Sequence, residues 1–221
     1  MSEPLRAPSV SRLHDTLLTT PGWPADAALL PVEPLWHWIA TNHRNNCLLW
    51  AEEDLARRTT VSDAEIAKNK RAIDGYNQAR NDATERVDEL LLIGLGLVDA
   101  ESARSDAPRS TVASGARLNS ETAGSMIDRM SIMALKIHAM RQQTLRSDVD
   151  DAHRSSSQVK LDRLLQQRQD LGDCLDALLA DSAAGRAYFK VYRQFKMYND
   201  ARFNPALVAE QKAQQAKAAG G

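Results

Sequence analysis

Polar side chains occupy the face of one predicted helix that packing should bury. At about 100° per residue, residues 34–58 bring the following side chains into one stripe: Trp36, Ile39, His43, Asn46, Cys47, Trp50, Asp54 and Arg57. Packing alone would favour Leu or Val throughout this stripe, because a buried polar group without a partner costs about 1–3 kcal/mol. We therefore expect its polar residues to form a partnered network, a ligand site or both.

Two carboxylates near the end of this helix have a cation within reach. Glu53 and Asp54 lie one helical turn before Arg57, so both are neighbours of its guanidinium group. One interpretation is an ion pair at the edge of the fold, with His43 bonded to a neighbouring helix. The other is a site in which Glu53 or Asp54 holds a cation while His43 and Arg57 contact an anionic substrate.

The next predicted helix begins after a capping box formed by Ser62 and Glu65 and runs to about residue 92. It carries a polar stripe made up of Asp74, Asn77, Gln78, Asn81, Glu85 and Asp88. Part of this stripe is interpreted as ordinary solvent-exposed surface of the helix. Asn77, Asn81 and Asp88 lie nearer the apolar boundary, where Asn, a poor helix former, gains little from an exposed position.

Carboxylates that face each other across two antiparallel helices are how helical bundles build sites for Mg²⁺ or Mn²⁺. We predict four such metal ligands, namely Glu53, Asp54, Glu85 and Asp88, with Mg²⁺ or Mn²⁺ as the cofactor. The spacing Glu85-x-x-Asp88 matches half of the pattern of the all-α nucleoside triphosphate pyrophosphohydrolases. Residues 52–54 do not supply the Glu-x-x-Glu half of that pattern.

A third helix is predicted from Asn119 or Ser120 to about residue 140, and its apolar residues cover most of its circumference. We expect it to be the central helix. The small polar residues at its start indicate simple capping, or alternatively free N–H groups for an anion. Asp128 and Arg129 indicate either a structural ion pair or a second layer around the His43 cluster.

Aromatic and basic residues alternate in a fifth predicted helix, from Gly185 to about Tyr198. Its cations are Arg186, Lys190, Arg193 and Lys196. They are expected to form a surface for a phosphate group or a protein partner. We do not expect nucleic acid, because 28 basic residues nearly cancel 29 acidic ones over the whole chain.

A fourth helix is expected from about residue 156 to 180, so every long segment is helical. The predicted fold class is all-α, an antiparallel bundle of four or five long helices. We expect an irregular N-terminal segment with a short helix over 1–33, and one bundle domain over 34–205 with a flexible loop at about 99–118. A frayed or disordered tail is expected over 206–221.

Two cysteines are too few for a disulfide framework, so Cys47 and Cys174 are expected to be reduced, buried thiols in a cytoplasmic protein. The longest apolar run, residues 90–98, is far shorter than the ~20 residues that span a bilayer. No membrane span is expected.

Four stretches resemble an uncharacterised bacterial family, the domain of unknown function 4254. They are residues 48–57, 77–82, 125–132 and 190–199, within a likeness that covers about residues 14–205. In that family a His often follows the Trp of the first stretch, where this chain has Ala51. The resemblance implies no catalytic residue. Because genes of the family tend to lie near glycosyltransferase genes of cell-surface polysaccharide assembly, it implies an association with that system.

Two hypotheses about function follow. In the first, the protein is a soluble helical bundle that binds a phosphate-bearing small molecule, with a divalent metal that polarises the phosphate if hydrolysis or transfer follows. The predicted ligand-binding residues are His43, Asn46, Trp50, Arg57, Asn77, Asn81, Asp128 and Arg129. In the second, it is a non-enzymatic helical partner or adaptor of a cell-surface glycan glycosyltransferase, and the polar clusters fix the register of the helices.

Overall fold

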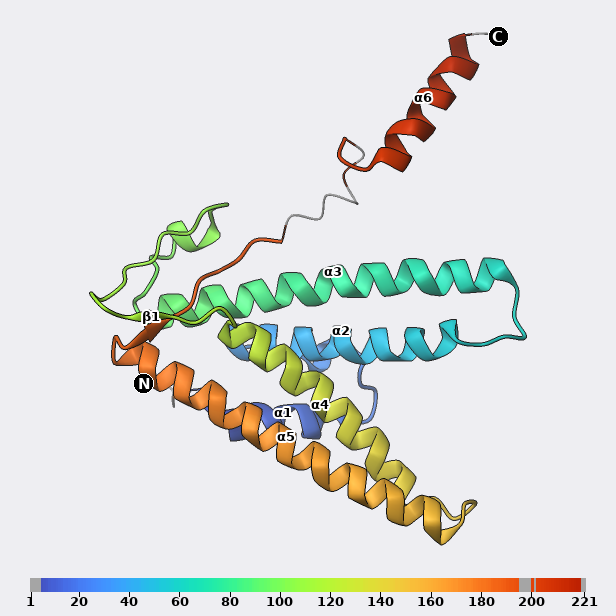
Figure 1. Ribbon diagram of the computed structural model, residues 1–221, viewed down its shortest axis with the longest axis horizontal. Helices are drawn as coiled ribbons and strands as arrows, with labels where there is room; N and C mark the ends of the chain where they lie inside the picture. Colours follow the sequence, from blue (N-terminus) through green and yellow to red (C-terminus); the bar gives the residue numbers. More distant parts are fainter. Residues whose placement is uncertain (1–4, 195–199, 201, 220–221) are drawn as a thin grey trace. The chain divides into compact units, whose positions relative to one another are not determined.

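The structure, a computed structural model, describes residues 5–194, 200 and 202–219. In these ranges it contains six α-helices (Figure 1), which confirms the all-α fold with four long helices. They are α1 (Ala7–Thr19), α2 (Pro34–Ala56), α3 (Asp63–Gly94), α4 (Ala123–Thr144), α5 (Asp151–Ala183) and α6 (Pro205–Ala219). Two single-turn helices, η1 (Ala27–Leu29) and η2 (Ser102–Arg104), lie in the connections.

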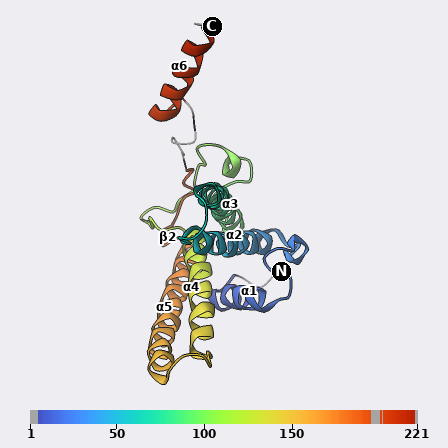
Figure 2. The ribbon, with the colours of Figure 1, turned by 90° about the vertical axis from the view of Figure 1, so that its right-hand side faces the viewer.

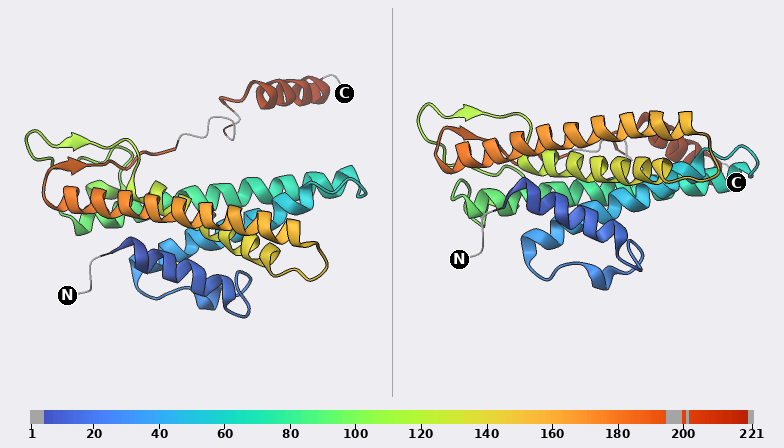
Figure 3. Two further views of the ribbon diagram at one scale, coloured as in Figure 1. Left: turned by 60° about the horizontal axis from the view of Figure 1, so that its bottom comes forward. Right: turned by 90° about the horizontal axis from the view of Figure 1, so that it is seen from below.

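The four long helices form two antiparallel hairpins. α2 packs on α3, and α4 packs on α5. Figures 1 and 2 show that the two hairpins cross each other. α4 lies at the crossing, where it contacts α1, α2 and α3 as well as α5. In both views of Figure 3, α1 and the segment after it lie on one side of the crossed hairpins.

Capping side chains explain where the helices begin. The Ser62–Glu65 capping box predicted from the sequence is present at the start of α3. α4 is capped by Thr122, whose hydroxyl accepts a hydrogen bond from the Ser125 amide at 3.1 Å, and so it begins after the predicted Asn119 or Ser120.

The start of α5 also differs from the prediction. Asp150 accepts a hydrogen bond from the His153 amide at 2.8 Å, and the helix therefore begins at Asp151 and not near residue 156. A carboxylate at this position satisfies an N–H group that the helix itself leaves unpaired.

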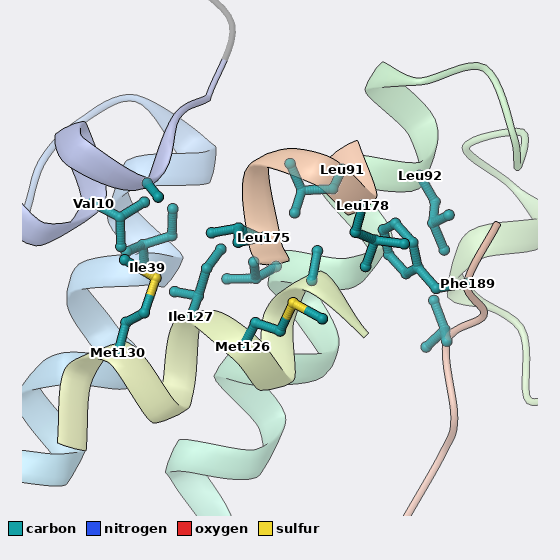
Figure 4. Close-up of a cluster of buried hydrophobic side chains, with 14 of the residues drawn as sticks. Val10, Ile39, Leu91, Leu92, Met126, Ile127, Met130, Leu175, Leu178 and Phe189 are labelled. Carbon is teal, nitrogen blue, oxygen red and sulfur yellow. The ribbon is translucent and has the colours of Figure 1, made fainter. Parts of the chain in front are cut away.

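The apolar core lies where α4 meets the other helices (Figure 4). Its members come from every helix of the two hairpins and from α1: Val10, Ile39, Leu91, Leu92, Met126, Ile127, Met130, Leu175 and Leu178, with Phe189 from the segment after α5. Because each element buries side chains in the same cluster, the core fixes the crossing of the hairpins.

The predicted helix from Gly185 to Tyr198 is wrong over residues 185–194, and residues 195–199 lie outside the described residues. Instead, β2 (Ala187–Tyr188) pairs in parallel with β1 (Arg117–Leu118). The amide of Asn119 donates to the carbonyl of Tyr188 at 2.8 Å. Ala187, Phe189 and Val191 are buried while the residues between them are more exposed. This two-residue period belongs to extended chain.

Contacts within the chain divide it into two units, Met1–Val191 and Tyr192–Gly221. The second unit contains α6, so a helix forms in the segment predicted to be a frayed or disordered tail. Asn204 accepts a hydrogen bond from the Ala206 amide at 3.0 Å, and Pro205 occupies the first helical position, which suits it. The predicted domain boundaries stay predictions.

Candidate functional site

A network of buried polar side chains joins α2, α3 and α4 where the hairpins cross. At its centre is Asp128, whose Oδ1 accepts hydrogen bonds from Asn42 Nδ2 at 2.8 Å and from Asn46 Nδ2 at 2.9 Å. Arg80 of α3 places its Nε 3.8 Å from the same oxygen. Asn42 and Asn46 are almost fully buried. Two amide donors and one cation thus compensate the carboxylate for the water it has lost.

The network continues to a serine and a histidine. Ser131 Oγ accepts from Asn46 Nδ2 at 3.0 Å and lies 2.7 Å from His43 Nδ1. Such a contact activates serine in some hydrolases. Here both side chains have 0% of their surface exposed. The contact joins α2 to α4 in the interior of the protein.

Two aromatic rings stack on the ring of His43. The ring of His14 stacks on it with 4.5 Å between centroids, and the ring of Trp23 lies at 5.8 Å. Trp23 Nε1 donates to Cys47 Sγ at 3.4 Å. His14 is fully buried, and neither of its ring nitrogens has a hydrogen-bond partner among the described residues.

Burial keeps these groups uncharged at neutral pH. It lowers the pKa of His43 to about 3. Burial also lowers the pKa of His14, and repulsion from His43 and Arg168 lowers it further. It raises the pKa of the Cys47 thiol to about 11, although the hydrogen bond from Trp23 opposes this. The cluster thus offers two neutral imidazoles and an inert thiol.

Three members of the predicted ligand set meet in this network, namely His43, Asn46 and Asp128. Two others do not reach it. Arg57 pairs with Glu53 at 3.2 Å near the exposed end of α2. This is the ion pair at the edge of the fold that one interpretation of the sequence predicted. Arg129 turns the other way from α4 and pairs with Glu121 at 2.5 Å.

Trp50, Asn77 and Asn81 complete the predicted ligand set. Trp50 is half-buried and lines a separate hollow against α4 and α5. Asn77 and Asn81 are half-buried on α3. Asn81 accepts a hydrogen bond from Arg80 Nη2 at 3.4 Å, which places it beside the network but not in it.

The four predicted metal ligands do not come together. Two hydrogen bonds fix the register of the α2–α3 hairpin, from Asn69 to Glu52 at 2.6 Å and from Asn42 to Thr84 at 3.0 Å. The segment of α3 from Asn69 to Glu85 rises by about 24 Å at 1.5 Å per residue. Carboxylates beside Glu52 therefore lie far from those beside Thr84.

Glu53 and Asp54 thus lie at one end of the hairpin, and Glu85 and Asp88 lie toward the other. Among the described residues, no three His, Cys, Asp or Glu side chains are close enough to hold a metal ion. The predicted four-carboxylate site is not formed. Binding of Mg²⁺ or Mn²⁺ by other groups stays a prediction.

Asp88 has a structural role at the start of α4. Its Oδ1 accepts a hydrogen bond from the Gly124 amide at 2.6 Å. Burial raises the pKa of Asp88 to about 7, while the Thr122 side chain and the Gly124 amide act in the opposite direction. The first amides of α4 are thus bonded to Asp88 and Thr122, as the capping interpretation predicts.

A cavity of about 1050 Å³ lies between α4 and α5 and extends to β1. Three cations line it, Arg117, Arg129 and Lys136. The α5 side contributes Gln167 and Asp170, together with Asp181, which pairs with Arg186 at 2.6 Å. Unlike the buried network, this cavity is open to solvent, and its lining combines these cations with the carboxylates of Glu121, Asp170 and Asp181.

Residues 36–191 match the model of a protein family described as a protein of unknown function, DUF4254. The chain belongs to this family. No curated protein and no solved structure matches it. The region shared with DUF4254 includes both hairpins, and with them Asp128 and the α4–α5 cavity. His14 and Trp23 precede that region.

Several residues of this DUF4254 network were not predicted. Asn42 lies one helical turn before Asn46, and Ser131 lies one turn after Asp128 on an otherwise apolar face, so both carried a signal in their spacing. Arg80 is one of many arginines, and its position in the sequence gave no such signal. His14 was not predicted because nothing in the sequence indicates that α1 packs beside His43.

The predicted partner surface of this DUF4254 protein is not a helical face in the described residues. Arg186 is paired with Asp181, and Lys190 Nζ lies 5.9 Å from the centre of the Tyr188 ring. Arg193 is half-buried, and Lys196 lies outside the described residues. None of the described helices has the length and apolar character needed to cross a membrane.

Proposed function

We propose that this protein binds a phosphate-bearing small molecule in the cavity between α4 and α5. The observation that supports this most strongly is the convergence of Arg117, Arg129 and Lys136 on a hollow of about 1050 Å³. Guanidinium groups bind phosphate oxygens through paired hydrogen bonds, and an ammonium group adds a compact charge. The volume is at the upper end of the range of about 300–1000 Å³ found for small-molecule sites.

The α5 wall of the cavity suits the rest of such a ligand. Gln167, Asp170 and Asp181 present amide and carboxylate groups toward the same space. Carboxylates accept hydrogen bonds from hydroxyl groups and repel phosphate. A ligand with its phosphate toward α4 and its hydroxyl groups toward α5 satisfies both walls.

The ion pair between Arg129 and Glu121 does not block this use of Arg129. Their side chains are 58% and 36% exposed. A pair as exposed as this one contributes little, about 0–1 kcal/mol. A phosphate with two or more charged oxygens therefore competes with the Glu121 carboxylate for the guanidinium group.

In this proposal the buried network does not bind the ligand but fixes the positions of the helices. His43, Asn46 and Asp128 bond α2 to α4 and thereby hold the cationic wall of the cavity in place. These three predicted ligand residues contact neighbouring helices and not the phosphate.

The proposal is tested by calorimetric titration with inorganic pyrophosphate. We expect Arg129→Gln to weaken binding at least tenfold, because a charge-assisted hydrogen bond contributes about 1.5–3 kcal/mol. Arg141→Gln is the matched control, since Arg141 is an exposed cation on the same helix that does not line the cavity. Equal affinities for all three proteins, or no binding by the wild type, would contradict the proposal.

The same titration with and without Mg²⁺ tests the predicted cofactor. Mg²⁺ commonly enters a site with the phosphate and keeps most of its waters. If pyrophosphate binds only when Mg²⁺ is present, the cation binds together with the phosphate. If it binds equally well without Mg²⁺, the arginines and the lysine bind the phosphate by themselves. The role as a glycosyltransferase partner stays a prediction.

A further inference from the structure

A second hollow adjoins the α4–α5 cavity beside Trp50 of α2. It measures about 450 Å³, and its floor is apolar, formed by Trp50, Ala139, Met140 and Leu164. All four side chains are half-buried. The floor thus presents apolar surface that the protein itself does not cover.

Cations stand around this apolar floor. They are Lys136, Lys160 and Arg163, and no Asp or Glu is among the described residues that line the hollow. Within the described part of the chain, none of the three has an ion-pair partner. A cationic rim without carboxylates attracts an anion, and an apolar floor attracts hydrocarbon.

The hollow and the α4–α5 cavity are adjacent. Lys136 and Gln167 line both of them, with Lys136 on α4 and Gln167 on α5. A phosphate bound by Lys136 therefore has the larger cavity on one side and the apolar floor on the other.

We infer that the ligand is an amphipathic phosphate, whose phosphate lies at Lys136 and whose aliphatic chain lies on the apolar floor at Trp50. This rests on the proposed function and names the class of its ligand. The ligand is a single-chain molecule taken up from solution.

An aliphatic chain fits this floor better than a nucleobase does. Among the described residues that line the hollow, the amide side chains are those of Gln143 and Gln167. The Gln143 Oε1 already accepts from Arg146 Nη1 at 3.1 Å and lies 3.2 Å from His153 Nε2. A base placed here would find few protein partners for its own donors and acceptors, whereas hydrocarbon needs none and gains from the apolar floor.

The test compares methyl phosphate with decyl phosphate, both below micelle-forming concentrations, by calorimetry. We expect decyl phosphate to bind at least about 50-fold more tightly, since each buried methylene adds a factor of about four. Decyl maltoside, which has the chain without the charge, is expected to bind at least tenfold more weakly than decyl phosphate.

Neighbouring leucines of α5 provide matched variants. Leu164→Gln places an amide in the apolar floor, whereas Leu165→Gln changes an equally half-buried side chain that lines a different hollow, against α1. We expect Leu164→Gln to reduce the 50-fold advantage of the chain to less than tenfold, and Leu165→Gln to leave it unchanged. Lys160→Gln removes a cation of the rim. Because Lys160 is exposed, the substitution should weaken the binding of decyl phosphate severalfold without disturbing the packing of α5.

The outcomes separate the two proposals. Pyrophosphate binding that depends on Arg129, with decyl phosphate no tighter than methyl phosphate, overturns the amphipathic ligand and leaves the proposed function standing. No binding of any phosphate overturns both. A chain advantage that survives Leu164→Gln, or binding of the protein only to sedimented vesicles of phosphatidic acid, also overturns the inference.

Discussion

At the scale of single residues, the protein stabilises uncharged titratable groups in its interior. His14 and His43 are stacked and fully buried, and the pKa of each is lowered, to about 3 for His43. Asp88 is shifted in the opposite sense, to a pKa of about 7. In all three cases the principal cause is the loss of water around the charged form.

These shifts predict how stability depends on pH. In the unfolded chain a histidine has a pKa of about 6.5 and takes up a proton below that value, while the buried ring does not. The free energy of unfolding should therefore fall as pH drops from about 6.5, by up to about 1.4 kcal/mol per pH unit for each histidine. His14→Phe removes one of these two contributions. The free energy of unfolding of this variant, measured by urea titration, should therefore fall less steeply between pH 6.5 and 4.5 than that of the wild type.

Asp88→Asn is the matched variant, and it should change the pH dependence of stability in the opposite direction. Because the pKa of Asp88 is higher in the folded protein than in the unfolded chain, this carboxyl group adds stability as pH falls from about 7 toward 3.8. Its removal should make the loss of stability on acidification steeper. Identical slopes for the wild type and both variants would show that the pKa values of His14 and Asp88 do not differ between the folded and unfolded chain.

At the scale of helices, α3 and α4 approach each other closely at one glycine. A Cβ atom at Gly124 would lie 2.6 Å from the carbonyl oxygen of Thr84 and 2.9 Å from the carboxyl group of Asp88. Only a residue without a side chain allows the Gly124 amide to reach Asp88.

Gly124→Ala should therefore destabilise the protein by about 1–3 kcal/mol, as overpacking does, because the backbone of α3 has to move. Gly75→Ala, in the α3 helix that Gly124 approaches, provides the control. Apart from its chain neighbours and the backbone of its own helix, no heavy atom lies within 4 Å of the added Cβ there, so Gly75→Ala should stabilise the helix by about 0.5–1 kcal/mol. Chemical denaturation measures both, and a stabilising Gly124→Ala would show that the helices are farther apart.

Much of the helical structure could be predicted from the sequence, because periodicity and caps are local. The Ser62–Glu65 capping box marks the start of α3 in both the sequence and the structure. The error at residues 185–194 has a physical cause. Ala187, Phe189 and Val191 fill the core from an extended segment that pairs with β1, and that pairing joins residues far apart in the chain.

At the scale of the whole molecule, the sequence indicated that polar residues would be buried but not which cavity would be open. The spacing of His43 and Asn46 predicted a partnered network, and the structure contains it. The carboxylates of α2 and α3 shared a face in the sequence pattern, yet the register of the hairpin separates them along its length. The α4–α5 cavity depends on how α4 packs against α5 and β1, which no local pattern encodes.

The two cysteines offer a direct measurement of the central claim, that the ligand lies between α4 and α5. Cys174 is exposed and lines that cavity, whereas Cys47 is buried and its thiol has a pKa raised to about 11. The rate at which N-ethylmaleimide alkylates Cys174 is measured with and without inorganic pyrophosphate, in a protein whose other thiol, that of Cys47, is buried and inert. The account predicts that saturating pyrophosphate slows alkylation of Cys174 at least fivefold in the wild type, and not in Arg129→Gln at the same concentration. An unchanged rate in the wild type would contradict it.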